Sequence, residues 1–212
     1  MTPRAQLREQ QQALAREHVL DATEAVIAER GLAGTTLRAV AARAEYSVGA
    51  LYQFFGGKGE LLTAVLLRRN QMLLDALQRA VDAAPTADAA LHAIVDVELD
   101  HFRDFPGAWR LFEETLGGGA NLVRRLAERG VDPQQYLRIM AVHERVFADG
   151  TRAGAFVGGD PVILAAMLAA LMTTYLSESF HHDGAFDDRF SRDELHALVD
   201  RAFRTPEHAR VH

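Results

Sequence analysis

Two Glu-x-x-His pairs in this chain have the spacing of metal ligands. Side chains three residues apart lie on the same face of a helix. Two such pairs, each preceded by a further glutamate, follow the ligand order of a ferritin-like di-iron helical bundle. One hypothesis is therefore that the protein is a di-iron enzyme, although short pairs of this kind also arise by chance. The pairs are Glu98–His101 and Glu178–His181, and the preceding glutamates are Glu60 and Glu144.

Other catalytic motifs are missing from the sequence. The chain has no cysteine, which excludes disulfides, cysteine nucleophiles and thiolate metal sites. It contains no G-x-S-x-G, H-E-x-x-H or dinucleotide-binding fingerprint. Residues 56–59 (GGKG) superficially suggest a phosphate loop, but they lack its spacing and the preceding strand. We therefore expect no enzyme activity, no cofactor and no metal, with the di-iron enzyme as the alternative.

The elements that position these residues are predicted to be helices throughout. The 212 residues are 49% apolar and rich in Ala, Leu and Arg, and the six prolines lie between periodic segments rather than inside them. No strand pattern competes, so the predicted fold is all-α with about nine or ten helices. The first helix is expected to end at Gly31, and the others to cover residues 37–44, 47–55, 59–84, 86–105, 106–116, 121–129, 132–152, 162–181 and 191–204.

The distribution of charge indicates two domains, and the hydropathy pattern predicts no membrane-spanning segment. The net charge is −6, yet residues 1–60 carry seven basic and seven acidic side chains, so the whole excess of acid lies in residues 61–212. The longest apolar run, Val162 to Met172, is too short to span a bilayer, and the N-terminus does not look like a signal peptide. We expect a cytoplasmic protein with domains at 1–60 and 61–212.

Residues 1–60 fit a three-helix DNA-binding domain of the helix-turn-helix type. Two short helices separated by a three-residue turn follow a longer helix. Thr36 and Ser47 are expected to cap the two short helices, which leaves free N–H groups at helix N-termini that favour phosphate. The small core of this domain is expected to contain Val40, Ala41, Leu51 and Phe55.

Three segments of this region resemble the signature of the TetR family. They are residues 36–41 (TLRAVA), 47–55 (SVGALYQFF) and 58–62 (KGELL), and the resemblance covers about residues 15–65. It implies a homodimeric transcriptional regulator, usually a repressor, that binds double-stranded operator DNA and is released by a small effector molecule. The sequence departs from the family at two turn positions, where Glu45 replaces the usual glycine and Tyr46 replaces a small apolar residue. A positive φ at Glu45 would be strained, and either change could alter the angle of the recognition helix.

The resemblance also implies which residues contact DNA. Gly49 would bring the backbone of the recognition helix close to the duplex, and Gln53 is the base-facing residue with a hydrogen-bonding code, since glutamine pairs well with adenine. Tyr52 could instead be a half-buried packing residue, and Lys58, the only lysine, a solvated charge. The implied phosphate contacts are Thr36, Arg38, Ser47, Tyr52 and Lys58, and the implied base-facing residues are Val48, Ala50 and Gln53.

Two helices of the second domain are predicted to form a dimer interface. Residues 162–175 are apolar almost all round, which is typical of a helix buried on more than one side. The last helix carries one apolar stripe. The helices at 162–181 and 191–204 are therefore predicted to pair with the same helices of a second copy, which makes a four-helix interface. In the alternative, both helices belong to the monomer core. The stripe consists of Leu195, Leu198, Val199, Ala202 and Phe203.

The second domain is also predicted to hold a pocket for a largely apolar ligand. Glu98 and His143 each lie on an otherwise apolar helix face, where a buried polar group needs a partner. They could be the polar groups of the pocket, or Glu98 could pair with an arginine or histidine inside the core. The expected pocket residues are Glu98, Phe102, Phe105, Trp109, Tyr136, Met140, His143 and Tyr175.

Overall fold

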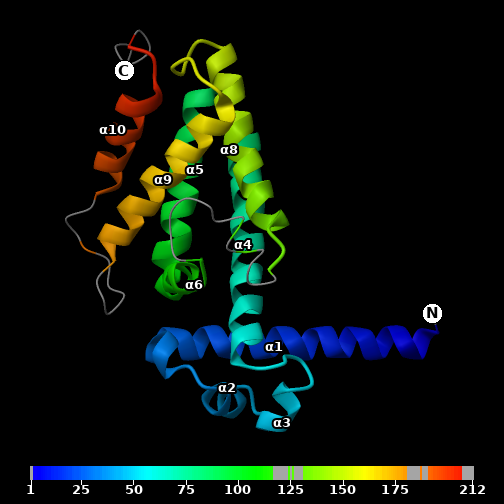
Figure 1. Cartoon of the computed structure of the whole chain (residues 1–212). Helices are drawn as coiled ribbons and strands as arrows, with labels where there is room; N and C mark the ends of the chain where they lie inside the picture. Colours follow the sequence, from blue (N-terminus) through cyan, green and yellow to red (C-terminus); the bar gives the residue numbers. More distant parts are fainter. Residues whose placement is uncertain are drawn as a thin grey trace. The chain divides into compact units, whose positions relative to one another are not determined.

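The computed structural model of the chain describes residues 2–116, 124, 126, 131–180, 187 and 191–206. The fold is all-α, as predicted, and the described part contains nine named helices and one isolated β-bridge, between Phe156 and Arg204 (Figure 1). The helices are α1 (Pro3–Gly34), α2 (Leu37–Arg43), α3 (Val48–Leu51), α4 (Lys58–Ala83), α5 (Ala87–Asp104), α6 (Pro106–Leu116), α8 (Gln134–Arg152), α9 (Pro161–Ser179) and α10 (Arg192–Phe203).

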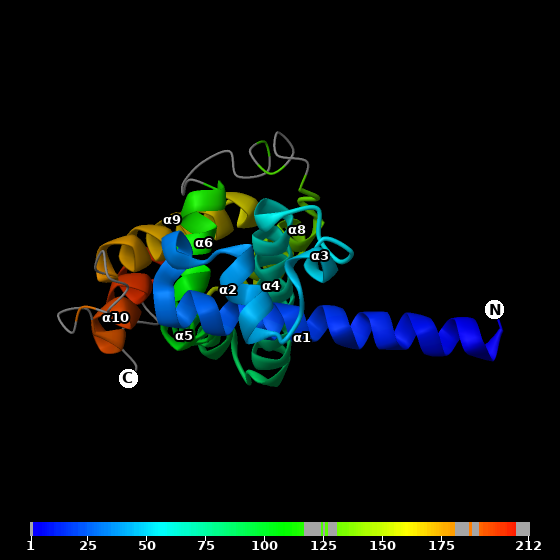
Figure 2. The ribbon, with the colours of Figure 1, turned by 90° about the horizontal axis from the view of Figure 1, so that it is seen from below.

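The chain divides into two compact units, Met1–Arg68 and Arg69–His212. We call the first the head and the second the body. The division lies within α4, eight residues beyond the boundary expected from the sequence at 60/61. The head contains α1, α2, α3 and the first part of α4, and Figure 2 shows α2 and α3 beside α1.

Side-chain caps define where several helices begin. Thr36 and Ser47 each accept a hydrogen bond from the backbone N–H three residues later, as predicted, and Thr86 does the same at the start of α5. Ser191 caps α10 in the same way through Glu194, and Asp160 caps α9 through the N–H of Val162, two residues later. These bonds satisfy N–H groups that a helix start leaves without partners.

Of three predicted helix boundaries, one is confirmed, one was wrong and one cannot be compared. Gly31, where the first helix was expected to end, has a non-helical backbone with φ of 67° and ψ of 176°, and the short remainder of α1 up to Gly34 follows this kink. α3 ends at Leu51, and residues 52–54 form a turn instead of extending the helix to Phe55. The helix predicted at 121–129 lies outside the described residues, except for Arg124 and Leu126, which are helical.

The body core is built by α5, α8, α9 and α10, together with residues of α4 and with Trp109 of α6. Phe147 lies at its centre, with ring centroids 5.6 Å from Phe156 and 5.0 Å from Phe203. The Phe156 ring lies directly over Gly150, where a Cβ atom would be only 2.1 Å from it. A larger residue at position 150 would therefore displace Phe156 from this core.

In the monomer, α9 is buried on one side and exposed on the other. The helix is long and apolar enough to cross a membrane, but one of its sides packs into the body core, which is typical of a core helix of a globular protein. Its other side leaves Val162, Ile163 and Met167 more than half exposed. The apolar stripe of α10 divides similarly: Leu195, Val199 and Phe203 are buried, whereas Leu198 and Ala202 are exposed.

Candidate DNA interface and effector site

The turn between α2 and α3 is closed by a backbone hydrogen bond across a strained residue. The N–H of Tyr46 donates to the carbonyl of Ala41 over 2.9 Å, the bond of a Schellman C-cap. Glu45 therefore adopts φ of 59°, in the left-handed region that favours glycine. The strain suspected at this position from the sequence is present, because glutamate stands where the turn requires a positive φ.

Tyr46, the second departure from the family pattern, is a packing residue. Its ring centroid lies 6.2 Å from that of His18 on α1 and 6.0 Å from that of Phe54. A ring nitrogen of His18, Nε2, lies 3.2 Å from the carbonyl oxygen of Ala44. The large side chain thus joins α1 to the turns on both sides of α3, a role that sequence reasoning missed.

α3 presents an exposed surface above a small buried core. Leu51 and Phe55 are buried together with Val40 and Ala41 of α2, which confirms the predicted core of the head. Ser47 caps the helix through the N–H of Ala50. The residues expected to face DNA lie outside this core: Val48, Gly49, Tyr52 and Gln53 are exposed, and Ala50 is half-buried.

The exposed residues offer both kinds of contact that DNA recognition requires. The Gln53 amide provides a donor and an acceptor, as reading of an adenine edge demands. Val48 provides apolar surface of the kind that meets a thymine methyl. Tyr52 is 57% exposed, so the alternative that it is a half-buried packing residue is wrong.

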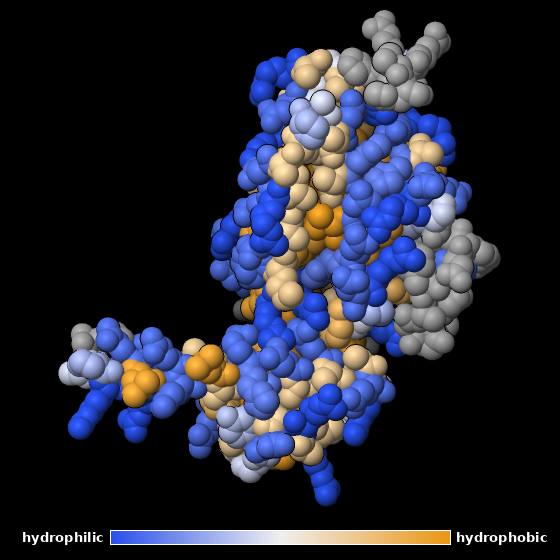
Figure 3. Space-filling model, turned by 180° about the vertical axis from the view of Figure 1, so that it is seen from behind, coloured by the Kyte–Doolittle hydropathy of each residue, from blue (hydrophilic) through white to orange (hydrophobic). Residues whose placement is uncertain are grey.

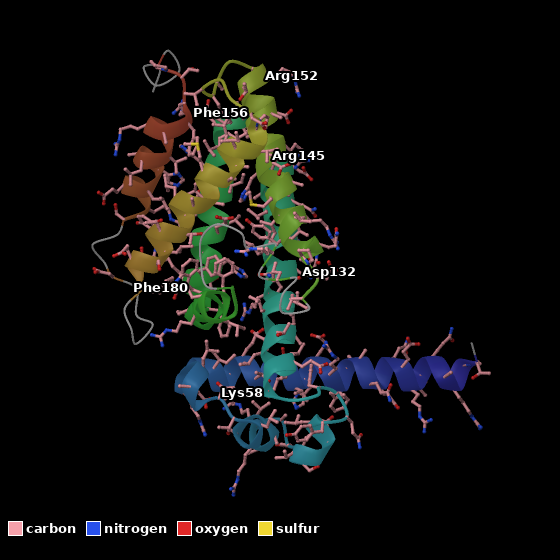
Figure 4. The ribbon with its side chains drawn as sticks, viewed as in Figure 1. Lys58, Asp132, Arg145, Arg152, Phe156 and Phe180 are labelled. Atoms are coloured by element: carbon pink, nitrogen blue, oxygen red, sulfur yellow. The ribbon has the colours of Figure 1, made fainter. Side chains whose placement is uncertain are left out.

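The cationic and hydroxyl side chains predicted to contact phosphate differ in their surroundings. Thr36 and Arg38 are exposed at the start of α2. Lys58 lies at the start of α4 (Figure 4), and its Nζ donates to the carbonyl of Leu32 over 3.1 Å. This bond satisfies a carbonyl near the end of α1, so Lys58 is more than a solvated charge. An ammonium group has three donors, and two remain for other partners.

In the body, Glu98 and His143 form the buried pair that one alternative predicted. The Oε1 of Glu98 lies 3.1 Å from Nε2 of His143, and the two side chains are 10% and 1% exposed. The contact is within ion-pair distance if the imidazole is protonated. It lacks hydrogen-bond geometry, and neither ring nitrogen of His143 has a hydrogen-bond partner within the described residues. The pair is therefore close but incompletely satisfied.

A separate group of aromatic side chains begins at Phe102, one turn after Glu98 on α5. Phe102 packs edge-on against Trp109 at 5.2 Å, and Phe112 stacks on Trp109 at 5.4 Å. The indole N–H of Trp109 is buried without a hydrogen-bond partner in the described part of the chain. Burial, and the charge of Glu98, raise the pKa of Tyr136. Sequence reasoning did not include Phe112 in the site, although its position three residues after Trp109 places the two on one helix face.

Two predicted pocket residues are engaged with other groups. The guanidinium of Arg69 lies over the ring of Phe105, and its central carbon is 4.2 Å from the ring centroid. The hydroxyl of Tyr175 donates to the carbonyl of Ser191 over 2.9 Å, which ties α9 to the start of α10. Met140 is buried in the common core. The structure thus brings together Glu98, His143 and Tyr136, and separately Phe102 and Trp109.

The geometry does not favour a metal centre. The described residues contain no cluster of three or more His, Asp or Glu side chains able to hold a metal. Glu60, a ligand in the di-iron alternative, accepts a hydrogen bond from the N–H of Gly56 in the head. His101 packs against the ring of Phe102. His181 lies outside the described residues.

The family model for bacterial regulatory proteins of the tetR family matches residues 19–65. Over this segment the chain belongs to the TetR family. The matched segment contains α2, α3 and the start of α4, that is, the helix-turn-helix of the head. This TetR-family match is to regulatory proteins, and it favours a regulator over the di-iron enzyme suggested by the two Glu-x-x-His pairs.

Individual relatives match over the same limited extent. The chain is 41% identical over 86 residues to the HTH-type transcriptional regulator BetI of Burkholderia thailandensis, covering 40% of this chain and 44% of that protein. It is 36% identical over 80 residues to the HTH-type transcriptional repressor KstR of Mycolicibacterium smegmatis, covering 38% and 39%. The chain thus matches less than half the length of these curated relatives.

The fold similarity extends further than the sequence similarity. A TetR-family transcriptional regulator from Pectobacterium atrosepticum superposes with a TM-score of 0.68, covering 90% of this chain and 93% of that one, at 21% identity. At this identity the likeness concerns the fold alone. It extends over most of the chain, so the body has the TetR-family fold although its sequence has diverged.

Proposed function

We propose that this protein is a DNA-binding transcriptional regulator, a repressor that binds a palindromic operator as a dimer and is released by a small, largely apolar ligand. The observation that carries the proposal is the capped, exposed α3 within a TetR-family head. The relative KstR is a transcriptional repressor, which supports the choice of repression over activation. A DNA partner implies a cytoplasmic location.

Selection of fragments from random double-stranded DNA by the full-length protein tests the central claim. We expect an inverted repeat whose half-sites lie about one helical turn apart, or a multiple of it, because a two-fold dimer presents two recognition helices. Failure to enrich any sequence above the input would refute the proposed function.

The proposed division of DNA contacts assigns phosphates to Thr36, Arg38, Ser47, Tyr52 and Lys58, and bases to Val48, Ala50 and Gln53. Gln53→Ala should weaken preference at one base position by about 1–3 kcal/mol if the contact is bidentate. Gln78→Ala removes an exposed amide on α4, in the body, and serves as the matched control. An unchanged selected motif for Gln53→Ala would show that another face of α3 meets the bases.

The dimer is proposed to form through the exposed apolar side of α9 together with α10. Exposed apolar surface of this kind is typical of an interaction site. Because Phe203 is buried within the monomer, a charge there would disrupt folding, and Met167 and Leu198 are better positions to test. We expect Met167→Glu with Leu198→Glu to give a monomer by light scattering and to weaken operator binding.

Leu137→Glu places the same charge at an exposed leucine of α8 and provides the control for that experiment. It should leave both mass and operator affinity unchanged. A monomeric double variant that binds the operator at full affinity would contradict the proposed dimer.

The effector is proposed to bind beside the Glu98–His143 pair and the aromatic cluster of Phe102, Trp109 and Phe112. Buried polar groups without full hydrogen bonding favour a ligand that supplies a donor or a positive charge among apolar contacts. Compounds that release the operator should change the emission of Trp109, the only tryptophan. Glu98→Gln should weaken release without abolishing DNA binding, whereas Glu144→Gln, on the same helix as His143, should not.

A further inference from the structure

The N-terminal part of α1 is a helical arm that packs against nothing in the head. The helix begins at Pro3, yet its first buried residue is Val19, and residues 2–14 are all exposed. At 1.5 Å per residue, Arg4 lies about 22 Å along the helix from Val19. Figures 1 and 2 show this arm, residues 3–14, extending past α2 and α3 of the same unit.

The composition of the arm explains why it is helical without packing. Its residues are Arg, Ala, Gln, Leu and Glu, all strong helix formers, after a proline at the first turn. Because the arm continues a helix that is already packed, no separate nucleation is needed. Its sequence therefore supports a rigid extension rather than a loose tail.

Two features of the arm oppose this helical stability. Arg4 and Arg8 are four residues apart, so two positive charges are neighbours on the helix surface, which destabilises a helix by about 0.2–0.5 kcal/mol. Arg4 also lies in the first turn, which has no acidic residue and where the helix dipole disfavours a cation. Neither arginine has an ion-pair partner in the described part of the chain. A bound polyanion would turn both features into favourable interactions.

The two arginines project to the side of α1 that carries the helix-turn-helix. Eighteen residues make five full turns, so Arg4 lies on the helix face of Ala22, and Arg8 on that of Val26. Both apolar residues are buried, and Val26 lines a groove with Arg38 of α2. The arm's one acidic residue, Glu9, lies about 100° around the helix from Arg8.

The opposite side of α1 carries carboxylates. Glu17, Asp21 and Glu24 all bind Arg68 of α4, at 3.1, 2.7 and 2.5 Å. Arg4 and Arg8 thus lie on the side of α1 toward α2, and these three carboxylates lie toward α4. The carboxylate of α1 that meets α2, Glu29, is paired with Arg43. A side of α1 with arginines and a neutralised carboxylate suits contact with a polyanion.

We propose that the arm is a second DNA-binding element, in which Arg4 and Arg8 bind phosphates of the duplex flanking the base pairs contacted by α3. The proposal rests on the proposed function as a DNA-binding regulator. Figure 3 shows the arm as mostly hydrophilic, with separate apolar patches. Its two leucines, Leu7 and Leu14, are one heptad apart, too few for a coiled coil with a second copy, which needs three to four heptads.

Salt dependence of operator binding by the full-length protein tests the arm. The logarithm of operator affinity falls linearly with the logarithm of salt concentration. Two arms with two phosphate contacts each make this slope steeper by about 3.6. Between 50 and 200 mM salt, the variant Arg4→Gln/Arg8→Gln should therefore lose about 100-fold less affinity than the wild type. Glutamine keeps the helix propensity of the arm. The double variant Arg79→Gln/Arg152→Gln makes the same charge change at exposed positions of the body and should keep the wild-type slope.

Trimming the duplex to the selected motif gives a second measurement. The wild type should bind the trimmed duplex more weakly than one with ten flanking base pairs on each side, while Arg4→Gln/Arg8→Gln should bind both equally. An unchanged slope and flank dependence in this variant would overturn the arm proposal and leave the helix-turn-helix intact. A wild type that binds no duplex would overturn both proposals. The variant Leu7→Gln/Leu14→Gln tests whether the arm contacts a second copy of the chain instead. If this variant has a lower mass by sedimentation and the arginine variant keeps the wild-type slope, the arm is a protein contact and the proposal is overturned.

Discussion

Replacement of Glu45 by glycine should stabilise the head. Glu45 holds φ of 59° between α2 and α3, a conformation that costs a residue with a Cβ about 1–2 kcal/mol. Glycine adopts it without that strain but loses about 0.5–1 kcal/mol more conformational entropy on folding. The difference predicts a net stabilisation by Glu45→Gly of about 0.5–1 kcal/mol. The Schellman bond from Tyr46 to Ala41 should remain, because it involves backbone atoms only.

Amide hydrogen exchange in peptides covering α2 and α3 is the appropriate assay, since it reports the opening free energy of the head separately from that of the body. Glu45→Ala is the control, because alanine removes the charge and keeps the strained backbone. Glu45→Gly should slow exchange relative to the wild type, and Glu45→Ala should not. Equal slowing in both variants would refute the strain argument and point to the charge of Glu45 instead.

Three further substitutions test contacts elsewhere. Gly150→Ala should destabilise the body by about 1–2 kcal/mol in thermal unfolding, since its Cβ would meet the ring of Phe156 at 2.1 Å, and Phe156→Leu should recover part of the loss. Arg68→Ala should weaken protection of α1 by about 1–2 kcal/mol, because it removes one ion-pair partner of the largely buried Glu24; unchanged exchange would contradict this. Burial raises the pKa of Asp96, but hydrogen bonds from Arg192 and His196 lower it by a larger amount, so the pKa is shifted downward overall. Asp96 therefore stabilises above its unfolded pKa of about 4, and Asp96→Asn should be less stable than the wild type at pH 7 and converge with it near pH 2.

The head could be predicted from the sequence because its signals are local. Thr36 and Ser47 precede short helices and cap them, and Glu45 stands where a turn needs glycine, as the structure confirms. The packing of Tyr46 between His18 and Phe54 was not predictable in this way, because it joins residues 28 positions apart along the chain. The bond from Lys58 to Leu32 was missed for the same reason.

The body resisted prediction where burial depends on which side of a helix faces the core. The apolar stripe of α10 includes Leu198 and Phe203, yet one is 38% exposed and the other 1%. A helix that is apolar on several sides gives no periodic signal to separate these cases. The pairing of Glu98 with His143 was open in the sequence for a related reason, since the distance between α5 and α8 is a tertiary property.

Adjacent arginines of α4 suggest how the two proposed functions could be coupled. Arg68 binds three carboxylates of α1 in the head, and Arg69 lies over the ring of Phe105 in the body. Phe105 separates α5, which carries Glu98 and Phe102, from α6, which carries Trp109. A ligand at that site changes DNA affinity only if it binds one state of α4 more tightly than the other. Changing a 99:1 population to 1:99 requires a difference of about 10⁴-fold in ligand affinity. Several contacts that differ between the two states must supply such a difference, and Phe105, which both contacts Arg69 and adjoins the aromatic cluster, is where we expect the two states to differ first.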